Sequence, residues 1–155
     1  CTVEEELGIP LKELIDKHAG GVRGGWDNLL AVIPGGASVP VLNKEQCDAV
    51  TMDYDALREL RSGLGTAAVM VMDKSTDIVK AITRLSAFYK HESCGQCTPC
   101  RVGCEKAVKL MQEECWDKEL LEDVSAAMVD ASICGLGQAA PNPIRMTIKH
   151  FANEI

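Results

Sequence analysis

Three cysteines in one short loop are the residues of this 155-residue chain whose type and spacing could do chemistry. Cys94, Cys97 and Cys100 stand in Glu92–Arg101 (ESCGQCTPCR) and form a C-x2-C-x2-C pattern. A gap of two residues turns the chain, so successive thiolates face a common point and can occupy three corners of an iron–sulfur cubane. Structural zinc more often uses two separated pairs of cysteines, or cysteine with histidine. The pattern favours a 4Fe–4S cluster, with zinc as the alternative.

A fourth ligand must come from elsewhere, and the sequence offers two cysteines. Cys104 completes the C-x2-C-x2-C-x3-C run of bacterial ferredoxins, in which the fourth cysteine serves a second cluster and precedes proline. Here Glu105 follows, no second cysteine triplet exists, and Cys104 would lie in the first turn of a helix beginning at Arg101. Cys134 instead stands in a glycine-rich loop, where the backbone can approach a cluster and direct N–H groups at its sulfurs. We predict Cys134 as the fourth ligand and keep Cys104 as the alternative.

The other candidate groups receive ordinary interpretations. Cys47 and Cys115 are expected to be thiols in or near small cores, and His91 a surface or hydrogen-bonding residue. Arg101 either offsets the charge of a four-thiolate cluster or is a common first-turn side chain. Four of the eight cysteines fall within eleven residues, and this clustering favours metal binding over a disulfide framework.

Composition excludes several function classes. The formal net charge is −7, the pI is near 5.0, and there is no basic run or stripe, which argues against nucleic acid and anionic membranes as partners. No apolar stretch approaches the ~18 residues that span a bilayer. The chain opens at Cys1 within an acidic run, so we expect it to be a piece of a larger or processed polypeptide.

The first part of the chain, residues 1–72, mixes short apolar runs with glycine and proline. Residues 10–18 have apolar side chains at helical spacing, and residues 55–61 predict one or two further helical turns. Short buried strands are predicted at 28–33, 38–42 and 66–72. Helices mixed with short strands indicate a small α+β domain.

The second part, residues 73–155, has the pattern of a helical bundle. Helices are predicted over 76–90 with Ser75 as cap, 101–114, 118–131, and from a cap and first-turn proline at Asn142 and Pro143 onward. Residues 132–143 are predicted as a loop. Four helices indicate a bundle, and the domain boundary is expected near residues 72–74.

Several segments together resemble one family, the NADH-oxidising flavoprotein subunit of respiratory complex I. Its relatives include NAD-dependent formate dehydrogenases and NAD-reducing hydrogenases. Beside the cysteine loop, the resemblance rests on HAGGVRGGW, IPGGASVP, LGTAAVMVMD and SICGLGQAAPNP, which occur in the family's order from one end of the chain to the other. The last of these segments is more similar to the formate dehydrogenase and hydrogenase branch.

The resemblance implies a fold for each part. Residues 1–72 correspond to an N-terminally truncated, ubiquitin-like β-grasp domain, and residues 73–155 to the four-helix 4Fe–4S domain. It also implies Cys134 as the fourth ligand. The family's FMN- and NADH-binding domain, which precedes this region, is absent, and Gly20–Gly25 lacks the spacing of a dinucleotide fingerprint.

The function implied is that of the electron-transfer portion of an NADH:acceptor oxidoreductase. The cluster would pass single electrons from FMN to further iron–sulfur clusters, and the isolated chain would be inactive with NADH. Implied partners are the flavin-bearing portion and a small and a larger iron–sulfur subunit, in the bacterial cytoplasm or on the matrix side of the mitochondrial inner membrane. The competing hypotheses are a zinc-stapled interaction module and a redox-sensing cluster, although no DNA-binding element supports the latter.

Overall fold

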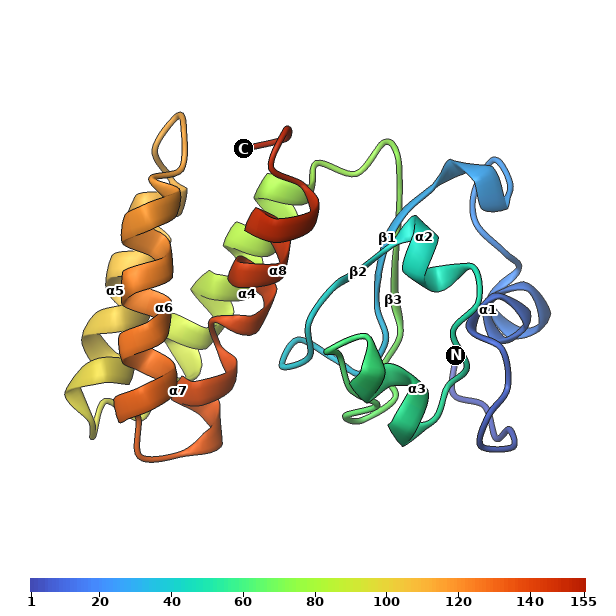
Figure 1. Cartoon of the computed structure of the whole chain (residues 1–155), viewed down its shortest axis with the longest axis horizontal. Coiled ribbons are helices and arrows are strands. Elements are labelled where there is room, and N and C mark those ends of the chain that lie inside the picture. Colours follow the sequence, from blue (N-terminus) through green and yellow to red (C-terminus); the bar gives the residue numbers. More distant parts are fainter. The chain divides into compact units, whose positions relative to one another are not determined.

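The computed structural model describes all residues from 1 to 155 and divides the chain after Thr76 into two units. The first unit spans Cys1–Thr76 and the second Asp77–Ile155. Figure 1 labels their helices and strands. The α+β class predicted from the sequence is confirmed, because all strands fall in the first unit and the second is helical.

The first unit contains a three-stranded antiparallel sheet in the order β2-β1-β3 (Figure 1). The central strand β1 (Leu29–Ile33) is largely buried, and its Val32 lies opposite Leu42 of β2 (Leu42–Asn43) and Val71 of β3 (Met70–Asp73). The predicted central strand is confirmed. The two neighbouring strands begin later in the chain than predicted.

A close crossing of two glycines explains why β3 begins late. A Cβ on Gly35 would lie 2.4 Å from the Leu64 carbonyl oxygen, and one on Gly65 would lie 2.2 Å from the Gly35 oxygen. Gly65 also has a φ of +49°, a left-handed conformation that glycine adopts without a steric penalty. Backbone contact at this crossing occupies residues 64–66, so the extended segment can join the sheet only after it.

Short helices cover the rest of the first unit. They are α1 (Leu11–Ala19), the 3₁₀ turn η1 (Trp26–Asn28), α2 (Lys44–Cys47) and α3 (Tyr54–Glu59). Helix α2 was not predicted, because its four residues are too few to show a helical period. Its signal was a capping box, in which Asn43 and Gln46 bond reciprocally to each other's backbone N–H.

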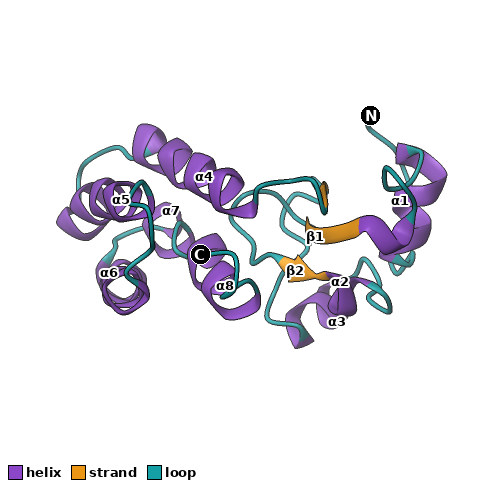
Figure 2. Cartoon of the chain, turned by 90° about the horizontal axis from the view of Figure 1, so that it is seen from above, coloured by secondary structure: helices purple, strands orange, loops and turns teal.

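The second unit is a bundle of four long helices with one short helix. The long helices are α4 (Ile78–Glu92), α5 (Thr98–Met111), α6 (Lys118–Ala131) and α8 (Asn142–His150). Helix α5 packs between α4 and α6, and α8 packs against both α4 and α6 (Figure 2). The four-helix architecture predicted from periodicity is confirmed. None of the chain's helices is both long enough and apolar enough to cross a membrane.

Details of the helix ends differ from the predictions. Asp77, not Ser75, caps α4 by accepting the Lys80 N–H at 3.0 Å, because the Ser75 hydroxyl is bonded to Asp73. Pro141 rather than Asn142 occupies the cap position of α8. Helix α5 begins at Thr98, three residues before the predicted start. Part of the predicted loop at 132–143 forms the short helix α7 (Gly135–Ala139).

Candidate metal centre

The predicted ligands lie on two segments of the second unit that meet beside the start of α5. Cys94 and Cys97 belong to the loop between α4 and α5, and Cys100 lies in the first turn of α5. Cys134 immediately precedes α7, which packs against α5. Two segments far apart in the sequence therefore contribute to the same region, as the prediction required.

The cysteine loop is held in shape by its own residues. Gly95 has a φ of +75°, so the chain turns left-handed between the first two cysteines. Its N–H donates to Ser93 Oγ at 3.3 Å, and its carbonyl oxygen accepts from the Arg101 guanidinium. The same guanidinium donates to Thr98 Oγ1 at 3.3 Å. Arg101 thus braces the loop from the first turn of α5.

Cys97 is surrounded by groups that favour its thiolate. It is the cap residue of α5, where unpaired N–H groups and the helix dipole favour a negative charge. Hydrogen bonding from the backbone N–H of Ile133, and then from that of Cys100, holds the pKa of the Cys97 thiol below its usual value. The Ser132 hydroxyl acts in the same direction. The segment that carries Cys134 therefore contacts Cys97 directly.

Cys100 is buried and has a polar neighbour on one side and a thiol on the other. Its Sγ lies 3.2 Å from Ser93 Oγ and 4.0 Å from Cys104 Sγ. Burial, together with the nearby Cys100 thiol, raises the pKa of Cys104 to about 12. Cys104 lies in the second turn of α5, not the first as predicted, because the helix begins earlier. Cys104 is a buried thiol packed among the side chains of the bundle.

The segment around Cys134 is packed tightly behind an exposed thiol. A Cβ on Gly137 would lie 2.4 Å from Ser132 Oγ and 2.9 Å from Cys100 Cβ, so only glycine lets α7 approach α5 this closely. Gln138 Nε2 donates to the Ser132 carbonyl oxygen at 3.0 Å and fixes the turn before the helix. The Cys134 side chain itself is exposed.

The donor set fits an iron–sulfur cluster. No group of three or more His, Cys, Asp or Glu side chains is arranged to hold a single metal ion. A cubane presents four separate iron corners with one thiolate at each, so its ligands stand further apart than those of one ion. Soft thiolates with N–H and hydroxyl donors directed at sulfur are the surroundings that such clusters require. The set of four ligands stays a prediction.

The remaining candidates have the surroundings of ordinary core or surface residues. Cys47 is 1% exposed in the core of the first unit, as expected for an ordinary core thiol. Cys115 was expected in or near a small core, and that expectation is wrong, because the turn between α5 and α6 leaves it exposed. His91 is exposed on the last turn of α4. Ser93 and Ser132 were not predicted as site residues, although each hydroxyl stands one or two residues before a candidate ligand in the sequence.

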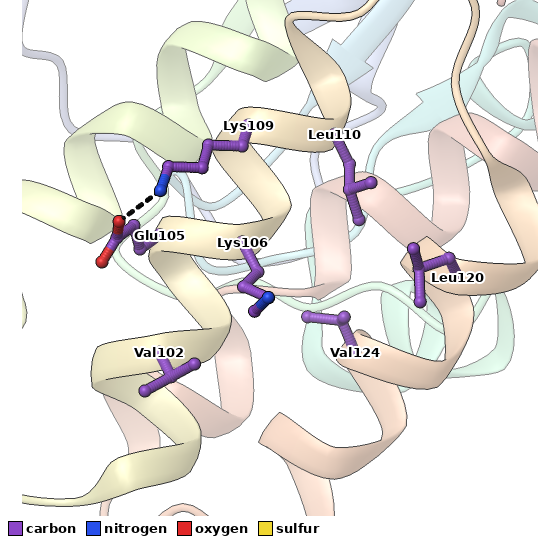
Figure 3. A pocket seen from close by; sticks show the side chains of 7 residues that line it. All are labelled: Val102, Glu105, Lys106, Lys109, Leu110, Leu120 and Val124. Carbon is purple, nitrogen blue, oxygen red and sulfur yellow. Dashed lines mark ion pairs between the residues drawn. The ribbon is translucent and has the colours of Figure 1, made fainter.

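A groove between α5 and α6 is lined by different kinds of residue from those of the cysteine site. Figure 3 shows seven residues that line it, mostly aliphatic side chains with one ion pair between Glu105 and Lys109 at 2.7 Å. The groove contains no cysteine or histidine. The predicted ligands of this unit therefore lie outside this groove.

Comparison with family models divides the chain much as the fold does. Residues 1–79 match the model of the SLBB domain. Residues 80–155 match the model described as the NADH-ubiquinone oxidoreductase-F iron-sulfur binding region. Together the two models account for the whole chain.

Curated relatives match along the full chain. It is 56% identical to the mitochondrial 51 kDa subunit of NADH-ubiquinone oxidoreductase of Neurospora crassa and 58% identical to an NADH-quinone oxidoreductase subunit of Rhizobium meliloti. The alignments cover 100% of this chain but only 33% and 37% of those proteins. The chain thus corresponds to a part of each relative.

Solved structures also match this chain, at lower sequence identity than the curated relatives. An NAD+-reducing [NiFe]-hydrogenase in the H2-reduced state matches with a TM-score of 0.75 and 30% identity, over 96% of this chain and 25% of the hydrogenase chain. The identities are higher for the NADH-ubiquinone oxidoreductase subunits than for the hydrogenase. They give no support to the prediction that the segment SICGLGQAAPNP places the chain nearer the hydrogenase branch.

Proposed function

This chain belongs to the family of the 51 kDa subunit of NADH-ubiquinone oxidoreductase, and we propose that it is the electron-transfer portion of such a protein. In this role it takes electrons that a flavin has received from NADH and passes them singly to further iron–sulfur clusters. The observation that carries the proposal is the meeting of the cysteine loop with the segment that holds Cys134, where α7 packs so closely on α5 that a Cβ on Gly137 would lie 2.9 Å from Cys100 Cβ.

Four thiolates would hold the cluster, those of Cys94, Cys97, Cys100 and Cys134. When bound, a 4Fe–4S cluster stores and releases one electron with little rearrangement. The chain's own residues hold and orient it. Arg101 fixes the loop, Gly137 lets the two segments approach, and backbone N–H groups stabilise negative charge on sulfur.

Partners must supply the other steps. Because the chain corresponds to only part of its relatives, we propose that FMN and NADH bind in an N-terminal portion outside it. A small and a larger iron–sulfur subunit of the same complex would accept the electrons. The relatives include mitochondrial and bacterial proteins, so we propose the matrix side of the inner membrane or the bacterial cytoplasm as its location.

The proposal predicts a brown chain that cannot use NADH alone. The chain is reconstituted anaerobically with iron and sulfide, and ferricyanide reduction by NADH is measured with and without an added flavoprotein portion. We expect visible absorbance that bleaches on reduction with dithionite, and NADH-dependent turnover only when the flavoprotein is present. Turnover by the chain alone, or a colourless chain that takes up zinc in preference to iron, would contradict the proposal.

A further inference from the structure

Two serine hydroxyls lie near candidate ligands, one from each of the two segments that form the site. Ser93 precedes the cysteine loop, and its Oγ lies 3.2 Å from Cys100 Sγ. The same oxygen accepts the Gly95 N–H at 3.3 Å. Because an accepted bond uses an oxygen lone pair, the hydroxyl proton of Ser93 remains available to the sulfur of Cys100. A bond in this direction is the one that a thiolate can accept.

Ser132 occupies the corresponding place on the second segment. Its side chain is only 6% exposed, yet its hydroxyl makes no hydrogen bond of good geometry within the protein. A buried hydroxyl without a partner costs about 1–3 kcal/mol, so its presence calls for an acceptor. A Cβ on Gly137 would lie 2.4 Å from Ser132 Oγ and 2.9 Å from Cys100 Cβ, so this hydroxyl lies between α7 and the cysteine loop. There it favours the thiolate form of Cys97.

We propose that the hydroxyls of Ser93 and Ser132 donate hydrogen bonds to the ligand sulfurs of Cys100 and Cys97 and raise the reduction potential of the bound cluster. The inference rests on the proposed function, since it requires these cysteines to be ligands. Reduction adds negative charge that spreads onto the sulfurs, and a donated hydrogen bond stabilises that charge more in the reduced state than in the oxidised state. Loss of either hydroxyl should therefore lower the reduction potential of the bound cluster.

The test uses the full chain reconstituted with iron and sulfide, in wild-type form and as Ser93→Ala and Ser132→Ala. The readouts are iron and sulfide content, and the reduction potential from a titration followed by electron paramagnetic resonance. We expect full clusters in both variants and a reduction equilibrium about tenfold less favourable in each, which corresponds to ~59 mV for a one-electron couple. Ser125→Ala is the matched control, because its buried hydroxyl already donates to the Leu121 carbonyl oxygen at 2.6 Å.

Each outcome decides the inference. Variants with full clusters and wild-type potentials would overturn it while leaving the proposed function intact, and a wild-type chain that assembles no cluster would instead overturn the proposed function. If an alanine variant holds no cluster, the variants Ser93→Thr and Ser132→Thr, which keep the hydroxyl, distinguish a role of the hydroxyl from a role in packing. Clusters with wild-type potential in these variants support a role for the hydroxyl, whereas loss of the cluster there too would assign both serines to packing and overturn the inference.

Discussion

A core thiol of the first unit and two candidate ligands of the second differ in the groups that surround their sulfur atoms. Cys47 of the first unit lies in an aliphatic core, and burial raises the pKa of its thiol to about 12. In the second unit Cys97 receives backbone N–H groups, which lower the pKa of its thiol, and the buried Cys100 has the Ser93 hydroxyl beside it. Burial alone therefore does not separate a core thiol from a candidate ligand. The donors directed at the sulfur make the difference.

The largest effect is expected from removing one predicted ligand. Cys134→Ser should abolish the cluster, because serine cannot replace a soft thiolate at an iron corner without weakening it. Cys104→Ser is the matched variant, and it should retain iron and sulfide near the wild-type ratio. Both are measured by iron and sulfide analysis after anaerobic reconstitution. Cluster loss in the second variant but not the first would exchange the roles of the two cysteines.

A smaller effect is expected where the two segments approach each other. In Gly137→Ala the added Cβ would lie within 3 Å of Ser132 and Cys100. Such overpacking costs about 1–3 kcal/mol in the free energy of unfolding and should also reduce the cluster yield. Gly135→Ala meets no atom within 4 Å and should stay within about 0.5 kcal/mol of the wild type. Denaturant unfolding of the two variants checks the difference, and equal stabilities would show that the approach is not tight.

Most of this arrangement could be predicted from the sequence, and the elements that could not be predicted have physical causes. Periodicity located the four long helices, and glycines beside Cys134 marked the second segment. The short helices α2 and α7 were missed because they contain too few residues to show a period. The early start of α5 was missed because Pro99 in a cysteine loop was not taken as a first-turn proline. The serines beside the sulfurs were missed because a hydroxyl next to a cysteine in the sequence does not show which sulfur it contacts, and Ser132 reaches the cysteine loop only through the packing of α7 on α5.

The smallest effect concerns the first unit and its alkaline stability. The folded chain keeps the Cys47 proton up to about pH 12, whereas the exposed thiol of the unfolded chain releases its proton near 9.0. The folded state then binds more protons above that pH, so the free energy of unfolding falls as pH rises, by up to about 1.4 kcal/mol per unit for one group. Cys47→Ala should lose roughly 1 kcal/mol of stability at neutral pH.

The stability difference between wild type and Cys47→Ala should narrow at pH 10, because only in the wild type does unfolding release this thiol proton and so become more favourable. Urea unfolding of the wild type and of Cys47→Ala, both without cluster, at pH 7.5 and pH 10 measures this difference. The titration of Cys104 cancels in the comparison, because both chains contain it. A difference that does not change with pH would mean that Cys47 is not shielded from solvent in the folded state.

The central claim is that four cysteines from two segments hold one iron cubane. The most direct measurement is the Mössbauer spectrum of the chain reconstituted with 57Fe and sulfide, before and after reduction with dithionite. The account predicts the spectrum of a four-iron cluster in tetrahedral sulfur coordination, which takes up one electron per cluster on reduction. A spectrum of isolated iron sites or of a two-iron centre, or a chain that binds no iron, would contradict it.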